Sequence, residues 1–297
     1  MDTKLILNLD LLLPEIIVVA TALGVILAEV ILPSEKRSRP IAAFAGFGLL
    51  VALLIIVLQR PVGEALKLVA EEGQPFAGMT LTEWRADLFA LFVRGLVVVG
   101  GLLVVMLSSG YTRRMDRGHG EFYELLLFAL LGVMLVSGVQ DLLTLFISIE
   151  LVTIPSYILV AFKRSDVRST EAGLKYLVTG AVSSAVLLFG IALVYGAVGE
   201  VAFPAIAQMI ASGDQNILLV LGLVMTVIGI FFKVGGFPFH VWIPDVYQGA
   251  PSPVTAFLST SSKAAGVVLM LRLGQAIVLP AVGSELGALW TWIFGGV

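Results

Sequence analysis

Long apolar segments separated by short polar connections make up most of the chain. Eight complete segments can be marked, at about 13–32, 41–58, 88–108, 122–140, 142–162, 171–198, 217–243 and 253–273, and a ninth begins near Glu285. Each of the eight has about the 20 residues that a helix needs to cross roughly 30 Å of hydrocarbon. The pattern therefore predicts an all-α polytopic membrane protein.

The polar connections predict how the spans are joined and oriented. Gln140 and Asp141 separate two neighbouring apolar segments, so spans four and five should form a helical hairpin. Basic residues concentrate in cytoplasmic loops, and those that follow spans one, three and five are Lys36, Arg37, Arg39, Arg113, Arg114, Arg117, Lys163, Arg164 and Arg168. The opposite side carries only Lys4, Arg60, Lys67, Arg85 and Arg272. We therefore expect a multi-pass protein of the bacterial inner (plasma) membrane, with its N-terminus outside on the periplasmic side.

Composition narrows the chemistry that the chain can carry. Hydrophobic residues make up 59% of the chain and charged residues 13%, against about 25% charged residues in an ordinary soluble domain. Without cysteine, and with only His119 and His240, the sequence lacks the ligands of iron–sulfur clusters, thiolate zinc sites and bis-His haem. A phosphate-binding glycine loop is also missing. We therefore expect no cofactor, no metal and no nucleic acid partner, and any redox chemistry would take place on another chain.

Ionisable residues inside apolar segments are candidate functional residues, and four stand out: Glu150, Lys175, Lys233 and Lys263. A charge at mid-bilayer costs about 2.5–3.5 kcal/mol on insertion scales. Glu150 lies nine residues after Asp141 and Lys263 ten residues after Pro253, which places each about 13–15 Å along its helix. Lys233 falls near the middle of span seven, and Lys175 lies a turn or two inside span six.

Hydroxyl side chains share helical faces with these charges, and two plainer interpretations stay open. Thr153 and Tyr157 follow Glu150 at helical spacing, and the corresponding neighbours of the three lysines are Thr179, Ser183, Thr226, Ser259 and Ser262. Each Ser or Thr hydroxyl can simply bond back to its own helix. Glu150 can also form a salt bridge with one lysine that only fixes packing. Three lysines against one obvious carboxylate, however, exceed what such pairing needs.

Two spans contain residues that interrupt helices. Pro155 lacks an amide hydrogen and displaces the carbonyl group of Leu151, so it should leave a bare acceptor in span five. In span seven, Gly235, Gly236 and Pro238 follow directly after Lys233. We expect two half-helices there, with the free carbonyl groups and the negative dipole end of the first stabilising the Lys233 ammonium.

Three stretches of the sequence resemble a known family. They are Phe-Phe-Lys-Val-Gly-Gly-Phe-Pro-Phe-His-Val-Trp-Ile-Pro-Asp-Val-Tyr-Gln-Gly-Ala-Pro at 231–251 with its continuation to Lys263, Ser-Ile-Glu-Leu-Val-Thr-Ile-Pro-Ser-Tyr at 148–157, and Glu-Ala-Gly-Leu-Lys-Tyr at 171–176. The sequence resembles the antiporter-like membrane subunits of respiratory complex I, NADH-quinone oxidoreductase. Lysine at position 263 and the Asp-Val-Tyr-x-Gly-Ala-Pro form look like the subunit N (subunit 2) branch.

The resemblance implies a helical bundle with inverted five-helix repeats, each containing a discontinuous helix. Residues 1–121 would be an N-terminal three-span segment, 122–273 the first repeat with its broken helix near 234–239, and 274–297 the truncated start of the second repeat. The chain ends about twelve residues into the ninth apolar stretch. We therefore expect a fragment of a longer protein, or a sequence that stops where a partner piece or missing region begins.

The resemblance also implies a function. By motif match, the family's proton-relay residues fall on Glu150, Lys175, Lys233 and Lys263, and the partners would be protons, the lipid bilayer and the other membrane subunits of complex I. Burial disfavours a lysine ammonium and a nearby carboxylate favours it, so a movement of Glu150 relative to Lys233 would bias proton release. This predicts a proton-translocating subunit without a redox centre. The alternatives are a subunit of a multisubunit sodium/proton antiporter and a non-conducting scaffold subunit.

Overall fold

A computed structural model describes residues 10–33, 38–67, 79–81, 84–112, 118–212, 216–236 and 239–278. Its helices are η1 (Asp10–Leu12), α2 (Leu13–Ile31), α3 (Ser38–Lys67), α4 (Leu88–Thr112), α5 (His119–Val136), α6 (Leu142–Val160), α7 (Val167–Val198), α8 (Phe203–Ala211), α9 (Ile217–Val234), α10 (Trp242–Gly249), α11 (Ser252–Phe257) and α12 (Lys263–Leu273). Two π-helical segments, η2 (Leu258–Ser262) and η3 (Gly274–Val278), flank α12. Predicted features outside the described residues are Pro238, the ninth span, Lys36, Arg37, Arg113, Arg114 and Arg117.

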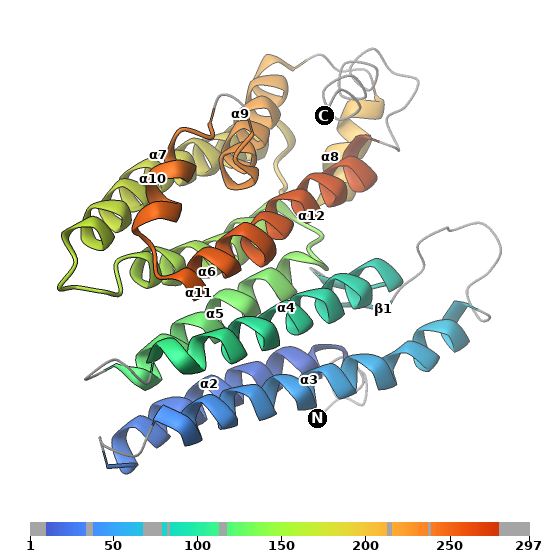
Figure 1. The fold of residues 1–297 in the computed structure, drawn as a ribbon. Helices are drawn as coiled ribbons and strands as arrows, with labels where there is room; N and C mark the ends of the chain where they lie inside the picture. Colours follow the sequence, from blue (N-terminus) through green and yellow to red (C-terminus); the bar gives the residue numbers. More distant parts are fainter. Residues whose placement is uncertain are drawn as a thin grey trace.

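The described residues contain eight helical stretches that are long and apolar enough to cross a membrane, which confirms the predicted polytopic helical fold. Large apolar side chains such as Leu27, Phe47, Phe92 and Val182 are exposed on their outer surfaces, as expected for helices that face lipid. Figure 1 shows α2 and α3 side by side at one edge of the bundle and α7 with α9 at the other, with α4, α5 and α6 between them.

The helices alternate in direction, so their ends form two faces. We call the face with the connections that follow α2, α4 and α6 the basic face. The opposite face, which we call the α8 face, carries the turn between α5 and α6 together with α8 (Figure 1). The α8 face also carries a feature that the sequence pattern did not predict, an antiparallel pair formed by β1 (Met79–Leu81) and β2 (Trp84–Ala86).

Polar side chains fix where several helices begin. The predicted hairpin of spans four and five is present as α5 and α6, and the Asp141 carboxylate accepts hydrogen bonds from the backbone N–H groups of Leu143 and Thr144. Asp166 caps α7 in the same way. Lys163, whose ammonium donates to the Asp166 carboxylate at 3.0 Å, holds the pKa of that exposed carboxyl below its ordinary value.

Helices α7 and α9 approach each other so closely that only glycine fits between them. A Cβ atom on Gly190 would lie 2.7 Å from the Gly222 carbonyl oxygen, and a Cβ on Gly222 would lie 2.8 Å from the Gly190 carbonyl oxygen. The Ser183 hydroxyl also donates to the Gly229 carbonyl group at 2.9 Å across this interface. Small residues at such positions are typical of membrane helix pairs, and here they bring α7 alongside the helix that carries Lys233.

Span seven is discontinuous, as the sequence predicts. Helix α9 ends at Val234, where Gly235 takes a left-handed conformation with φ 73°, and α10 begins at Trp242. Lys233 lies in the last turn of α9, one residue before the helix ends, as expected for a lysine at the end of the first half-helix. The prediction for Pro155 was wrong in one respect, because α6 runs through it without a break.

Candidate functional site

Lys233 is a buried lysine whose ammonium faces aromatic rings. Its side-chain nitrogen has no hydrogen-bond partner among the described residues. It lies 5.6 Å from the centre of the Tyr157 ring, 5.7 Å from that of Tyr176 and 6.0 Å from that of Phe232. Ring faces attract cations over such distances. The rings therefore supply part of the attraction that hydration would give an ammonium at the surface.

The rings around Lys233 belong to a larger cluster, which we call the aromatic cluster and define as Tyr157, Tyr176, Phe232 and Trp242. Tyr176 stacks on Trp242 with ring centres 4.7 Å apart, and Phe232 stacks on the same indole at 5.3 Å. Tyr157 meets Tyr176 edge to face at 4.8 Å. The cluster joins α6, α7, α9 and α10, so it fixes both halves of the broken span against the neighbouring helices.

The helix end beside Lys233 differs from the prediction. Free carbonyl groups were expected to hold the ammonium, but the Phe231 carbonyl accepts hydrogen bonds from Gly235 N and Gly236 N at 3.0 and 3.1 Å. The Phe232 carbonyl accepts from Gly235 N at 3.1 Å. These two acceptors are used by the glycine cap, and the lysine is surrounded by aromatic rings instead.

Glu150 lies half-buried near the middle of α6, as predicted. Its Oε1 atom accepts a hydrogen bond of 2.5 Å from the Ser184 hydroxyl on α7. Glu150 takes part in none of the ion pairs of the described residues, yet it is the carboxylate that interacts electrostatically with Lys233. The interpretation of a contact salt bridge that only fixes packing therefore has no support in this arrangement.

Lys263 lies at the middle of span eight, directly after the π-helical segment η2. Its ammonium is 5.6 Å from the centre of the Tyr247 ring. Helix α12 continues past Lys263 against the end of α9, where a Cβ atom on Gly266 would lie 2.8 Å from the Val234 side chain. The structure thus brings the ends of two lysine-bearing helices together at the aromatic cluster.

Lys175 stands apart from the other three residues. Its side chain is 46% exposed and its ammonium is 2.8 Å from Glu171 and 2.7 Å from Asp245. The prediction counted only one obvious carboxylate for three lysines, and this was wrong because Glu171 and Asp245 both pair with Lys175. Asp245 lies on α10, so this ion pair links the second half of the broken span to α7.

Some hydroxyl groups near these charges bond back to their own helix, and others bond to a neighbouring helix. Thr153, Thr179, Thr226 and Ser259 bond back to carbonyl groups of their own helices. Ser184, which was not among the predicted residues, carries the hydroxyl group that binds Glu150. Its signal was present, because Ser184 lies next to Ser183 on the same apolar helix, but spacing within α7 gives no information about a partner on α6.

Several buried polar atoms around the lysines lack a protein partner. Among the described residues they include Lys233 Nζ, the Tyr157 and Tyr247 hydroxyl oxygens and Trp242 Nε1. Buried polar groups are normally hydrogen-bonded, and water serves where the protein does not. These atoms are therefore candidates for hydrogen bonds to water, and the described residues contain no set of three or more metal-ligating side chains.

Comparisons with known proteins agree with this architecture. The profile of a family described as NADH:quinone oxidoreductase/Mrp antiporter, TM matches residues 139–294. The NADH-quinone oxidoreductase subunit N of Desulfitobacterium hafniense is 42% identical over 267 residues, which cover 89% of this chain and 51% of the relative. The NAD(P)H-quinone oxidoreductase subunit 2 of Synechococcus elongatus is 39% identical over 289 residues, covering 97% of this chain and 52% of the relative.

A solved structure gives the same result. A chain of the respiratory complex I from Thermus thermophilus with bound Aureothin superposes with a TM-score of 0.70 and 31% sequence identity, over 90% of this chain and 55% of that one. The chain spans about half the length of the curated relatives it matches. Because the family profile covers more than half of its residues, the chain belongs to the NADH:quinone oxidoreductase/Mrp antiporter transmembrane family.

Proposed function

We propose that this chain is part of a proton-translocating membrane subunit of NADH:quinone oxidoreductase, with quinone reduction on other subunits. The single observation that carries the proposal is Lys233, a buried ammonium without a hydrogen-bond partner among the described residues. A charge inside the membrane costs free energy when it is neither paired with an opposite charge nor exposed to water, and such residues mark functional sites. The names of the relatives favour this assembly over a sodium/proton antiporter.

The proposed relay runs from Glu150 to Lys233 and on to Lys263. A carboxylate stabilises a neighbouring ammonium, and an apolar environment destabilises it. The Ser184 hydroxyl holds the Glu150 carboxylate on the α7 side, so a displacement of α6 relative to α9 would change how readily Lys233 releases its proton. The hydroxyl groups of Tyr157 and Tyr247, with bound water, would then carry the proton between the lysines.

Lys175 has a different part in this proposal. Its two carboxylate partners hold its charge at the surface of α7. We propose that this position receives the coupling signal, since a shift of Asp245 would move α10 and with it Trp242 of the aromatic cluster. The remaining parts of the proposal are the other membrane subunits of complex I as partners and an N-terminus on the periplasmic side of the bacterial inner membrane.

The proposal is tested by Glu150→Gln in the full-length protein within its assembled complex. The substitution keeps the volume and an acceptor for Ser184 but removes the charge that acts on Lys233. We expect proton pumping into inverted membrane vesicles to fall, while electron transfer to quinone is retained in part. Glu200→Gln, which neutralises an exposed carboxylate on the α8 face, is the matched control. Unchanged pumping by assembled Glu150→Gln complex would refute the role of Glu150.

A second substitution distinguishes the alternatives. Lys263→Met removes the ammonium and keeps a chain of similar length, so the proton-to-electron ratio should fall, whereas Lys163→Met at an exposed position should not change it. A scaffold subunit would tolerate Lys263→Met without loss of pumping. An antiporter subunit would purify without quinone-reductase subunits and would show sodium-dependent proton exchange.

A further inference from the structure

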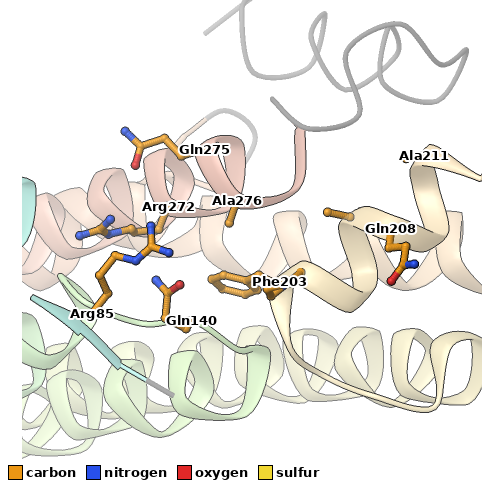
Figure 2. A pocket seen from close by; sticks show the side chains of 10 residues that line it. Arg85, Gln140, Phe203, Gln208, Ala211, Arg272, Gln275 and Ala276 are labelled. Carbon is orange, nitrogen blue, oxygen red and sulfur yellow. The ribbon is translucent and has the colours of Figure 1, made fainter. Parts of the chain in front are cut away.

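The α8 face contains a pocket that the relay does not use. It has a volume of about 490 Å³, within the range of small-molecule sites, about 300–1,000 Å³. Figure 2 shows Arg85 from β2, Gln140 from the turn between α5 and α6, Phe203 and Gln208 from α8, and Arg272 and Gln275 from the end of span eight around it. We call it the α8 pocket.

The lining of the α8 pocket is cationic. Arg85 and Arg272 contribute guanidinium groups, and none of the described residues that line the pocket carries a carboxylate. Arg272 is already neutralised, because it forms two hydrogen bonds of 2.6 and 2.7 Å with Asp87 behind the pocket wall. Arg85 is different: its Nε atom is buried without a hydrogen-bond partner, and it forms no ion pair with a described residue. Within the described part of the chain, Arg85 therefore presents to the pocket a positive charge without a paired carboxylate.

The rest of the lining combines amide groups with apolar carbon. Gln140, Gln208 and Gln275 contribute amide groups to the lining, and each amide carries two N–H donors. The Gln140 amide uses one of its donors for the Val139 carbonyl group at 2.9 Å, which leaves the other for a ligand. Phe203 forms an apolar floor, and the exposed ring of Pro204 continues that surface to the outside. Guanidinium and amide donors suit an anion with several oxygen atoms, and a planar guanidinium fits phosphate in bidentate geometry.

The position of the pocket favours one source for that anion. It lies where spans five and eight reach the α8 face. Because an apolar span of about 20 residues matches the hydrocarbon thickness, the ends of such spans are expected where hydrocarbon gives way to headgroups. A free anion would use the donors but not the apolar floor, whereas a phospholipid uses both. We propose that the α8 pocket binds the phosphate group of an anionic phospholipid, with Arg85 as its main charged contact.

The test measures lipid binding rather than activity. Full-length protein in its complex, purified in detergent and stripped of lipid, is titrated with dioctanoyl phosphatidylglycerol and, separately, dioctanoyl phosphatidylcholine, and bound lipid is counted by native mass spectrometry. Arg85→Gln should weaken phosphatidylglycerol binding about tenfold, the loss expected for one charge-assisted hydrogen bond. Arg164→Gln, which removes an exposed guanidinium on the basic face, is the matched control and should leave the affinity unchanged.

The possible outcomes separate the sources of the anion. Equal phosphatidylglycerol binding by Arg85→Gln and Arg164→Gln protein would overturn the proposal, as would inorganic phosphate competing as well as the lipid does. If Arg85→Gln protein does not assemble, Gln275→Leu removes an amide donor from the opposite wall and should weaken binding severalfold. A photo-crosslinker at Gln208 that captures another protein chain instead of lipid would also overturn the proposal.

Discussion

The ion pair between Asp87 and Arg272 offers the most quantitative test of how this bundle is held together. Asp87 is 8% and Arg272 is 3% exposed, so neither charge is solvated by bulk water. Arg272 Nη1 and Nη2 donate to the two Asp87 oxygen atoms at 2.6 and 2.7 Å, and its Nε donates to the Ser137 carbonyl group at 2.6 Å. The pair thus joins the start of α4 to the end of span eight.

The substitution Asp87→Asn isolates the charge from the other role of Asp87. Its Oδ1 atom also accepts a hydrogen bond of 2.8 Å from Ala90 N at the start of α4. Asparagine keeps that capping oxygen, so the capping contribution of about 1 kcal/mol is retained. What remains is a buried guanidinium without its counter-charge, for which we expect a loss of about 3–5 kcal/mol in the free energy of unfolding.

The assay is reversible unfolding of the full-length protein in mixed detergent and dodecyl sulfate micelles, followed by tryptophan fluorescence. Arg272→Met alone should cost a similar amount, because it leaves the Asp87 carboxylate and the Ser137 carbonyl group without their donor. The double variant removes both charges and should be much less destabilised than the sum of the single variants. Strictly additive losses, or a loss below about 1 kcal/mol for Asp87→Asn, would refute the reasoning.

Two further predictions concern glycines. In α7, Gly180→Ala should destabilise the protein, because the new Cβ would overlap the Tyr157 hydroxyl. Gly196→Ala should raise stability by up to about 1 kcal/mol, because no neighbouring atom lies within 4 Å of its Cβ. The same unfolding assay compares the two variants, and equal effects would contradict the packing of Tyr157. Gly235→Ala should lower stability by about 1–2 kcal/mol, because alanine is strained at φ 73°. An unfolding free energy that stays level or rises would mean that the segment has become regular helix.

The sequence was sufficient to predict where the eight spans lie along the chain, because each apolar segment carries its own signal. The hairpin at Gln140 and Asp141 and the break after Val234 were also local, since a polar pair and a glycine pair mark them. The strands β1 and β2 and the short helix α8 were missed. They are shorter than the apolar blocks, and β2 is fixed partly by a contact far along the chain, the hydrogen bond from Arg85 N to Gly138 O.

The candidate site was predictable in its charges but not in its contacts. Glu150, Lys233 and Lys263 were identified because a charge in an apolar segment is rare. Whether each has a partner depends on other helices, and so the pairing of Lys175 with Asp245, 70 residues away, could not be derived from spacing. The aromatic cluster could not be predicted either, because its rings come from four helices and because tyrosine and tryptophan are common residues in membrane proteins.

The π-helical segment Leu258–Ser262 has a consequence for how this chain is aligned with its relatives. A π-helical turn contains about one residue more than an α-helical turn. One residue corresponds to about 100° of rotation around the axis of an α-helix. The rotational position of Lys263 around the helix axis, relative to Pro253, therefore cannot be obtained by counting α-helical turns between them. A relative with one residue fewer in this stretch and a regular α-helix would have its lysine on the same side of the helix. An alignment of the two sequences should therefore contain a single-residue gap here, because without the gap the lysines would not be matched.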